Sequence, residues 1–229
     1  MNRQYSASLT SALLLCMVSC TTSKPPEAAA HHTPSSVSPA QALTRLKAGN
    51  KRFVSGSLQH PHQTAGRRSE LATGQHPFAI VLGCADSRTG PDILFDQGLG
   101  DIFVVRVAGN ILNDENIGSI EYGVEHLGAP LIVVLGHERC GAVKAAKETI
   151  AAKGKAPGHI ESLVKAIRPA VESTVGQDAE ATGDANVRNV VKSLQHSKPI
   201  LHEMVASGKV AVVGAYYDLD TGKVEFFKD

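Results

Sequence analysis

The sequence predicts an α/β fold, a mostly parallel β-sheet of four to five strands flanked by helices. Several unbroken runs of four or five aliphatic residues are typical of strands covered on both faces. Segments with helical spacing lie between these runs, as expected where crossover helices join parallel strands. The chain has 229 residues, 42% hydrophobic and 20% charged, which is ordinary globular composition at a length that can bury a sizeable core.

The elements follow in order along the chain. Ser38 has the character of an N-cap and Pro39 that of a first helical residue, so a helix is expected from there to Gly56. A short helix at 67–73 is closed by Gly74. Strands are expected at Phe78–Leu82, Ile102–Val105, Leu131–Leu135 and Val210–Val213, with a terminal hairpin strand at Val224–Phe227. Further helices are expected at Asn116–Leu127, Cys140–Ala152, Ile160–Thr174 and Val187–Val205, the last with Pro199 as a point of interruption.

Composition excludes several classes of function. Lys and Arg total 23 against 22 Asp and Glu, so no basic field exists to hold nucleic acid by its phosphates. No apolar run has the roughly 18 residues that a membrane span needs. There is no Trp, which disfavours an aromatic stacking platform, and four cysteines are too few for a disulfide scaffold.

The N-terminus is expected to direct export. Residues 1–19 have one early cation, Arg3, a short apolar stretch and a small residue before Cys20, the pattern of a signal peptide. The cysteine after the small residue resembles the lipobox of bacterial lipoproteins, which implies lipidation at Cys20 and a periplasmic or extracellular location. A plain secretory signal is the alternative.

Residues 20–38 are rich in Ser, Thr, Pro and Ala and contain almost no large apolar side chain. Such a segment cannot bury enough surface to offset the entropy of ordering it. We therefore expect a flexible, lipid-anchored tether at 20–38 and one catalytic domain at 39–229.

The remaining cysteines, Cys84 and Cys140, each follow a predicted strand, and His137 precedes Cys140 by three residues. Sites in parallel sheets gather at the carboxyl ends of strands. Two thiolates and one imidazole make a set of Zn²⁺ ligands, and three protein ligands leave the open position of a catalytic site. Two other interpretations remain: Cys84 as a small buried apolar residue, or a disulfide between the two cysteines.

Cys84-Ala-Asp86-Ser-Arg88, together with His137-Glu-Arg-Cys140-Gly, resembles the signatures of the β-class carbonic anhydrases, Cys-x-Asp-x-Arg and His-x-x-Cys-Gly. The resemblance runs from about Ala40 to the C-terminus. It implies one Zn²⁺ per subunit on Cys84, His137 and Cys140, reversible hydration of CO₂ to bicarbonate and a proton, and a homodimer or tetramer.

The resemblance also implies roles for Asp86 and Arg88. Asp86 would accept a hydrogen bond from zinc-bound hydroxide and orient it, while Arg88 holds the carboxylate ionised through a bidentate pair. In related enzymes Asp becomes a fourth zinc ligand in a closed form when the pair breaks. Members with that switch carry a Trp where this chain has Val81, so we expect Asp86 to pair with Arg88. A purely structural salt bridge is the alternative.

A narrow, mostly apolar pocket is expected for so small a substrate. Gly141, after Cys140, would open a helix whose N–H groups suit an anion such as bicarbonate, and it lets a ligand approach the backbone closely. By resemblance the pocket also includes Gln75, Phe103, Ala108 and Tyr122, some of them supplied by a neighbouring subunit. For Phe103 and Tyr122 an ordinary core position is the alternative.

The function predicted from the sequence is therefore that of an exported, zinc-dependent carbonic anhydrase, a lyase, with CO₂ and bicarbonate as its substrates. It would contact the membrane only through its lipid. Two rivals remain. One is a hydrolase of carbon disulfide or carbonyl sulfide on the same scaffold, and the other is a catalytically silent zinc-binding lipoprotein, which the intact Asp86 and Arg88 disfavour.

Overall fold

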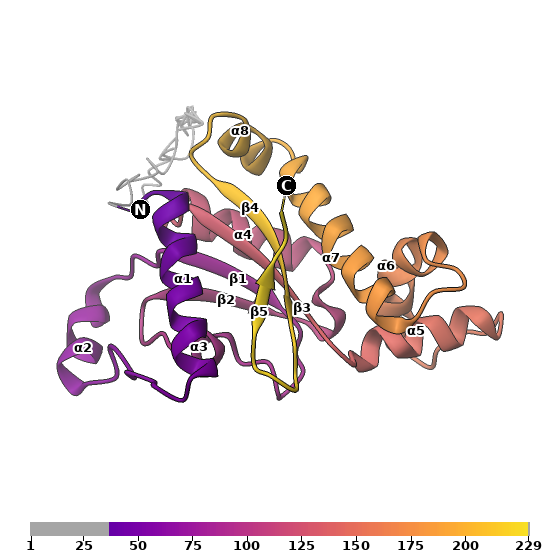
Figure 1. The fold of residues 1–229 in the computed structure, drawn as a ribbon. Coiled ribbons are helices and arrows are strands. Elements are labelled where there is room, and N and C mark those ends of the chain that lie inside the picture. The colour runs from indigo at the N-terminus through magenta and orange to yellow at the C-terminus, as the bar shows by residue number, and fades with distance from the viewer. Residues whose placement is uncertain (1–36, 229) are drawn as a thin grey trace, which may run out of the picture.

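A computed structural model describes residues 37–228 of the chain, in which one five-stranded sheet lies between layers of helices (Figure 1). The predicted signal peptide at 1–19, the lipidation site Cys20 and nearly all of the tether at 20–38 lie outside the described residues. The export signal, the lipid anchor and the tether therefore stay predictions from the sequence.

The sheet has the strand order β2-β1-β3-β4-β5. Strands β1 to β4 are mutually parallel, and β5 runs antiparallel to β4 as a terminal hairpin. The predicted α/β class and the five predicted strands are confirmed. The strands are β1 (Ala79–Gly83), β2 (Ile102–Arg106), β3 (Leu131–His137), β4 (Ala211–Tyr217) and β5 (Val224–Phe226).

The helices alternate with the strands, as expected for crossover connections. Two single turns of 3₁₀-helix, η1 (Leu71–Thr73) and η2 (Ala108–Asn110), accompany them. The α-helices are α1 (Pro39–Val54), α2 (Ala65–Glu70), α3 (Pro91–Leu94), α4 (Asp114–Glu125), α5 (Gly141–Ala151), α6 (Ile160–Ser173), α7 (Ala179–Gln195) and α8 (Ile200–Ala206).

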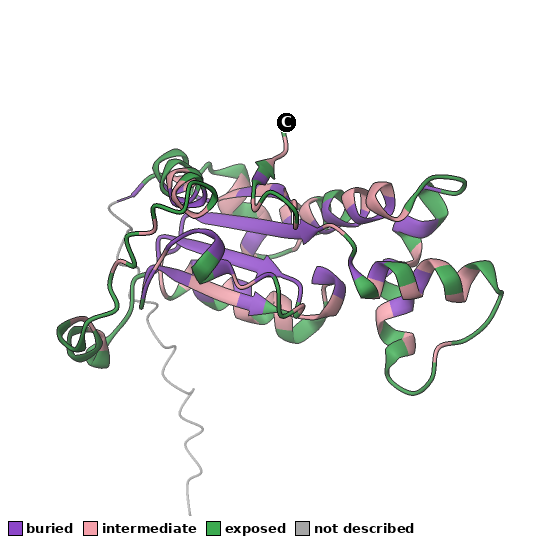
Figure 2. Cartoon of the chain, turned by 60° about the horizontal axis from the view of Figure 1, so that its bottom comes forward, coloured by how far each residue is buried: buried purple, intermediate pink, exposed green. Residues whose placement is uncertain are grey.

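The two central strands are buried on both faces. Every residue of β1 and β3 is buried, and alternate side chains enter two separate cores. One core joins Val81 and Val133 to α1 and α3, and the other joins Ile80 and Ile132 to α4, α7 and α8. Figure 2 shows these central strands in the colour of buried residues. Their covering on both faces explains why they appear in the sequence as unbroken aliphatic runs.

Helices α5 and α6 project beyond the end of the sheet toward which the parallel strands point (Figures 1 and 2). They pack on each other around a small core of their own that includes Ala146, Val164 and Ile167. The carboxyl ends of β1 and β3 therefore open toward the base of this projection, where α5 begins.

The first helix begins as the sequence predicts. The Ser38 hydroxyl accepts a hydrogen bond from the N–H of Gln41, the Gln41 side chain accepts one from the N–H of Ser38, and Pro39 is the first helical residue. This reciprocal pair is a capping box. Val37 is already buried in the core with α1, so packing starts two residues before the predicted domain boundary.

The predicted helix at Val187–Val205 was wrong at its start. Helix α7 begins at Ala179, after an Asp178 N-cap, and α8 follows the interruption around Pro199. Residues 179–186 lack an apolar stripe, yet Thr182, Gly183 and Asn186 are buried. Small and hydrogen-bonded polar side chains line this contact, so hydrophobic periodicity gives no signal there.

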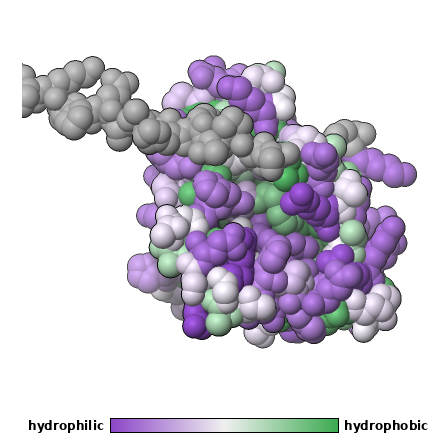
Figure 3. Space-filling model, turned by 90° about the vertical axis from the view of Figure 1, so that its left-hand side faces the viewer, coloured by the Kyte–Doolittle hydropathy of each residue, from purple (hydrophilic) through white to green (hydrophobic). Residues whose placement is uncertain are grey.

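None of the helices within residues 37–228 combines the length and the apolar character that crossing a membrane requires. The side of the molecule that carries α2 is mainly hydrophilic, with a small hydrophobic area next to the start of the described chain (Figure 3).

Candidate active site

Cys84, His137 and Cys140 lie together at the carboxyl edge of the sheet. Cys84 directly follows β1, His137 is the last residue of β3, and Cys140 is the N-cap of α5. All three are buried, and their ligand atoms lie within 4.8 Å of one another. The two sulfurs are 4.0 Å apart and form no disulfide. The convergence predicted from strand ends is therefore present.

The hydrogen bonds of His137 leave one nitrogen of its ring without a partner. Nδ1 lies 2.8 Å from the Glu138 carbonyl, to which it donates, so the neutral ring has its lone pair on Nε2. Nε2 is buried and has no hydrogen-bond partner among residues 37–228. Nδ1–H bonded to a carbonyl is the usual support of a metal-binding imidazole, and two thiols complete a donor set that fits Zn²⁺.

The site favours a negative charge on one of its two sulfurs. The hydrogen bond from the Cys140 thiol lowers the pKa of Cys84 to about 4, against the opposing effect of burial. The same contact, with burial, raises the pKa of Cys140. For His137, burial works to lower the pKa, but interaction with the Cys84 thiolate raises it overall. The cluster thus holds its first negative charge on Cys84.

Asp86 and Arg88 form the predicted bidentate pair. Arg88 Nε lies 2.9 Å from Asp86 Oδ1, and Arg88 Nη2 lies 2.7 Å from Oδ2. The Arg88 side-chain hydrogen bond is the main cause that lowers the pKa of Asp86. The N–H of Asp86 also lies 3.4 Å from the Cys84 sulfur, to which it donates. The carboxylate is therefore ionised and held beside the sulfur cluster.

Arg106, which was not predicted from the sequence as a site residue, holds the loop that follows β1. It ends β2 opposite Gly83. Its guanidinium donates to the carbonyls of Cys84 and Asp86, at 2.8 and 2.5 Å. Its position at the carboxyl end of a predicted strand is a signal that could have marked it.

A neighbouring backbone supports Cys84 from another side. The N–H of Gly109 in η2 donates to the Cys84 sulfur at 3.3 Å. The Gly109 carbonyl in turn accepts from the side chain of Asn186 on α7. Asn186 was also missed, because nothing local in the sequence connects it with a residue 77 positions away.

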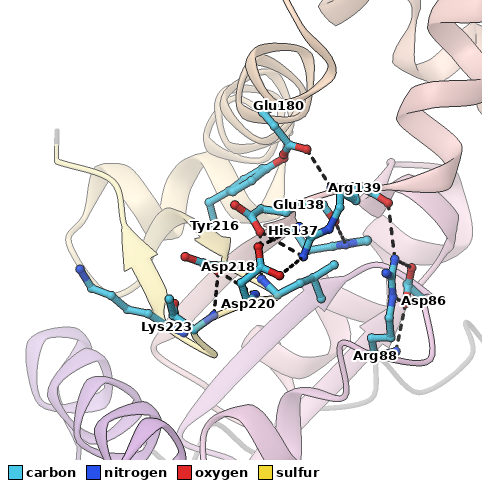
Figure 4. A network of polar contacts seen from close by, with 12 residues as sticks. Asp86, Arg88, His137, Glu138, Arg139, Glu180, Tyr216, Asp218, Asp220 and Lys223 are labelled. Atoms are coloured by element: carbon cyan, nitrogen blue, oxygen red, sulfur yellow. Dashed lines mark hydrogen bonds and ion pairs between the residues drawn. The ribbon is translucent and has the colours of Figure 1, made fainter.

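The loop between His137 and Cys140 is held by a wider polar network (Figure 4). Arg139 donates from its backbone N–H to Glu180 and pairs through its guanidinium with Asp220. Glu138 accepts a hydrogen bond from the N–H of Leu219. This loop is thus attached to α7 and to the turn between β4 and β5.

Two of the predicted pocket residues lie beside the cluster. Gly141 is the first residue of α5, directly after Cys140, and a side chain at its position would meet no atom within 4 Å. Ala108 begins η2, next to Gly109 and its contact with Cys84.

The other three predicted pocket residues are not brought to the cluster within one chain. Phe103 pairs in register with Ile80, four residues before Cys84 and so about 13 Å back along the strand. Its ring neighbours Tyr122 on α4, with centroids 6.4 Å apart, and Tyr122 is half exposed. Gln75 precedes β1 and lines a surface hollow with Leu71 and Leu99, at the opposite edge of the sheet.

Comparison with known proteins agrees with this geometry. The sequence profile of the carbonic anhydrase family matches residues 79–224. Carbonic anhydrase 2 of Mycobacterium tuberculosis is 43% identical over 81% of this chain and 91% of its own length. The carbonic anhydrase of Mycolicibacterium smegmatis is 42% identical over 82% of this chain and 92% of its own.

Solved structures give the same assignment. The β-carbonic anhydrase CcaA superposes with a TM-score of 0.66 at 26% identity, covering 81% of this chain and 95% of that one. A tetrameric β-carbonic anhydrase of Sordaria macrospora superposes with a TM-score of 0.64 at 25% identity, covering 83% and 95%. With its fold, its Cys-His-Cys cluster and these relatives taken together, the chain belongs to the β-class carbonic anhydrases, a family of lyases.

Proposed function

We propose that this protein catalyses the reversible hydration of CO₂ to bicarbonate and a proton, with one Zn²⁺ held by Cys84, His137 and Cys140. The observation that carries the proposal is the convergence of two buried thiols on a buried imidazole whose Nε2 has no hydrogen-bond partner in the described part of the chain. Zinc bound there would supply a water of lowered pKa near neutral pH. The three ligands leave the open position that a catalytic site requires.

Asp86 and Arg88 would orient the reacting water. The carboxylate is ionised, and both of its oxygens accept from Arg88 while lone pairs remain for one more donor. A water that donates to Asp86 presents its lone pair to CO₂ in a fixed direction, which is the positional contribution to catalysis. Because Arg88 holds the carboxylate at the cluster's margin, we propose that the site is open near neutral pH.

The product bicarbonate needs a binding place beside the metal. Gly141 lets an anion approach the backbone closely at the start of α5, where the helix N-terminus favours negative charge.

Gln75, Phe103 and Tyr122 would reach the pocket from a second copy of the chain, because one chain leaves them apart from the cluster. We therefore propose a homodimer or tetramer. The Sordaria macrospora relative is described as tetrameric, and sedimentation of the purified protein tests the assembly.

The export prediction also becomes a proposal: a signal at 1–19, an anchor at Cys20 and a location outside the cytoplasm. Its support is the sequence pattern alone. Fractionation of cells that make the wild type or Cys20→Ser tests it. The wild type is expected with the membranes and the variant in the soluble periplasmic or secreted fraction. An unprocessed chain in the cytoplasm would contradict the proposal.

The reaction is tested by stopped-flow CO₂ hydration with the zinc-loaded protein and its Cys84→Ser variant between pH 6.5 and 9. Fast hydration that rises with pH and is lost in the variant supports the proposal. A wild-type rate equal to buffer, with zinc bound stoichiometrically, would overturn it. The same protein should then be assayed with carbon disulfide and carbonyl sulfide.

A further inference from the structure

The loop from His137 to Cys140 contains an unusual backbone conformation. Arg139 has a φ of +50°, in the left-handed region that is uncommon for a residue with a side chain. The chain turns there between two candidate ligands, so the conformation of this residue sets how the two ligand atoms face each other. Such a conformation persists only where its surroundings hold it.

Glu180 is the side chain that holds this backbone. Its Oε1 accepts the Arg139 N–H at 2.9 Å, and its Oε2 accepts the Tyr216 hydroxyl at 2.8 Å (Figure 4). Glu180 lies in the first turn of α7, where the helix dipole stabilises a carboxylate. One carboxylate therefore links the ligand loop to α7 and to β4.

The packing of α7 fixes where this carboxylate lies. A Cβ added at Gly183 would come within 2.4 Å of the Tyr216 hydroxyl, and one at Gly136 within 2.9 Å of the Tyr216 ring. The two glycines thus let the ring fit closely between β3 and α7. The close fit restricts movement of the Tyr216 ring, and its hydroxyl in turn helps to hold Glu180, the acceptor for Arg139, in place.

The same loop reaches the Asp86–Arg88 pair. The Arg139 carbonyl accepts a weak hydrogen bond from Arg88 Nη2 at 3.4 Å. A change in the conformation of Arg139 would therefore disturb both the ligand spacing and the arginine that orients Asp86.

We propose that Glu180 is a positioning residue of the metal centre: it holds Arg139 in its left-handed conformation and so fixes the relative placement of His137, Cys140 and Arg88. The inference rests on the proposed function. It gives α7, a helix that supplies no ligand, a direct part in the geometry of the site. Polar groups that support metal ligands typically change metal affinity or activity by about 10- to 100-fold when removed.

The test uses full-length protein loaded with Co²⁺, whose visible spectrum reports the coordination geometry, alongside Zn²⁺ affinity and kcat for CO₂ hydration. Glu180→Ala is expected to alter the cobalt spectrum and to lower Zn²⁺ affinity or kcat by about 10-fold or more. Glu180→Gln keeps an acceptor for Arg139 and can donate to the Tyr216 oxygen, so it should restore most of the wild-type behaviour.

Asp178→Ala is the matched control. It removes the N-cap of the same helix, where Asp178 accepts from the N–H of Ala181, but leaves Glu180 in place. Loss of the cap lowers the melting temperature, yet the cobalt spectrum and kcat should match the wild type. A Glu180→Ala protein that behaves like Asp178→Ala in spectrum, affinity and kcat would overturn the inference.

Tyr216→Phe provides a second variant that removes only the hydroxyl bound to Glu180. It should shift the cobalt spectrum in the same direction as Glu180→Ala, by less. An unchanged spectrum in every folded variant overturns the inference while the proposed function stands. A wild type that binds neither metal overturns the proposed function, and the inference with it.

Discussion

Two loops form the candidate site, and they are held in different ways. The loop after β1, from Cys84 to Arg88, is held by neighbours: Arg88 pairs with Asp86 two residues away, and Arg106 reaches it from the adjacent strand. The loop after β3, from His137 to Cys140, is held by residues 41 and 81 positions further along the chain. The candidate metal centre thus combines a local construction with one that depends on tertiary structure.

The largest effect on activity is expected in the local loop, with Arg88→Leu. The substitution removes both side-chain donors to Asp86, which frees the carboxylate to turn toward the metal. CO₂ hydration should fall by about 100-fold or more, the scale of losing a preorganised polar partner, with zinc content unchanged. Arg168→Leu, which removes a partly exposed arginine paired with Glu172 on α6, is the control. Near-normal turnover by Arg88→Leu would contradict the role given to the pair.

A smaller loss is expected for Arg106→Leu, which supports the same loop through its carbonyls. Both hydrogen bonds to Cys84 and Asp86 disappear, but the ligands and the Asp86–Arg88 pair remain. We expect kcat to drop by roughly 10-fold with little change in KM, because a supporting contact has been lost. In Arg106→Lys the single ammonium group cannot reproduce the two directed donors of the guanidinium. Its kcat should therefore lie between those of the wild type and of Arg106→Leu. A variant in which KM rises while kcat is unchanged would show that Arg106 acts in substrate binding instead.

Asp220→Asn probes the exposed end of the tertiary loop. Asp220 pairs with the Arg139 guanidinium, but both side chains are more than half exposed. Solvent weakens such pairs, and Glu180 still holds the Arg139 backbone. The kcat should stay within about twofold of the wild-type value, and the cobalt spectrum should match that of the wild type. A loss as large as that of Glu180→Ala would mean that the side chain of Arg139, rather than its backbone, positions the loop.

The smallest effect on activity is expected at Asp96, which contacts neither loop. Burial acts to raise the pKa of Asp96, but hydrogen bonds from Arg52 and from the N–H groups of Gln59 and His60 hold this pKa below its usual value. Its stabilising effect is therefore fully present above the unfolded pKa near 3.9 and is lost as pH falls through the lower folded value. Denaturant unfolding should show Asp96→Asn about 1–3 kcal/mol less stable at pH 7.

As the pH is lowered, the free energies of unfolding of the wild type and of Asp96→Asn should converge. Their kcat values at pH 7 should be equal. A constant gap between them down to pH 2 would show that Asp96 acts by packing rather than by charge.

The same division between local and tertiary construction explains what the sequence could predict. Aliphatic runs that end in Gly83-Cys84 and Gly136-His137 locate both strand ends, so the convergence of the cysteines and the histidine follows from parallel topology alone. Asp86 and Arg88 are two residues apart, and their pairing is equally local. These parts of the site were predicted and are present in the structure.

The remaining parts depend on contacts that no local pattern marks. Glu180 lies in the stretch of α7 that hydrophobic periodicity missed, because the buried residues there, such as Thr182 and Gly183, are small or polar. Asn186 and Arg139 take their roles from partners far along the chain. Gln75, although it stands nine residues before Cys84, lies across the length of β1 from it, so its predicted role depends on a second chain.

The attachment of the second loop to later parts of the chain has a consequence for biosynthesis. Both candidate ligand loops leave the ribosome before α7, β4 and the turn at Asp218–Asp220, which hold His137 to Cys140 in place. Domains fold as their segments become available during synthesis. The nascent chain therefore carries the candidate ligands Cys84 and Cys140, but no finished metal pocket, until residues 218–220 have emerged. Zinc acquisition is accordingly expected to follow the emergence of these later segments, and a chain that stops before Asp218 should bind the metal weakly when titrated with Zn²⁺ in vitro.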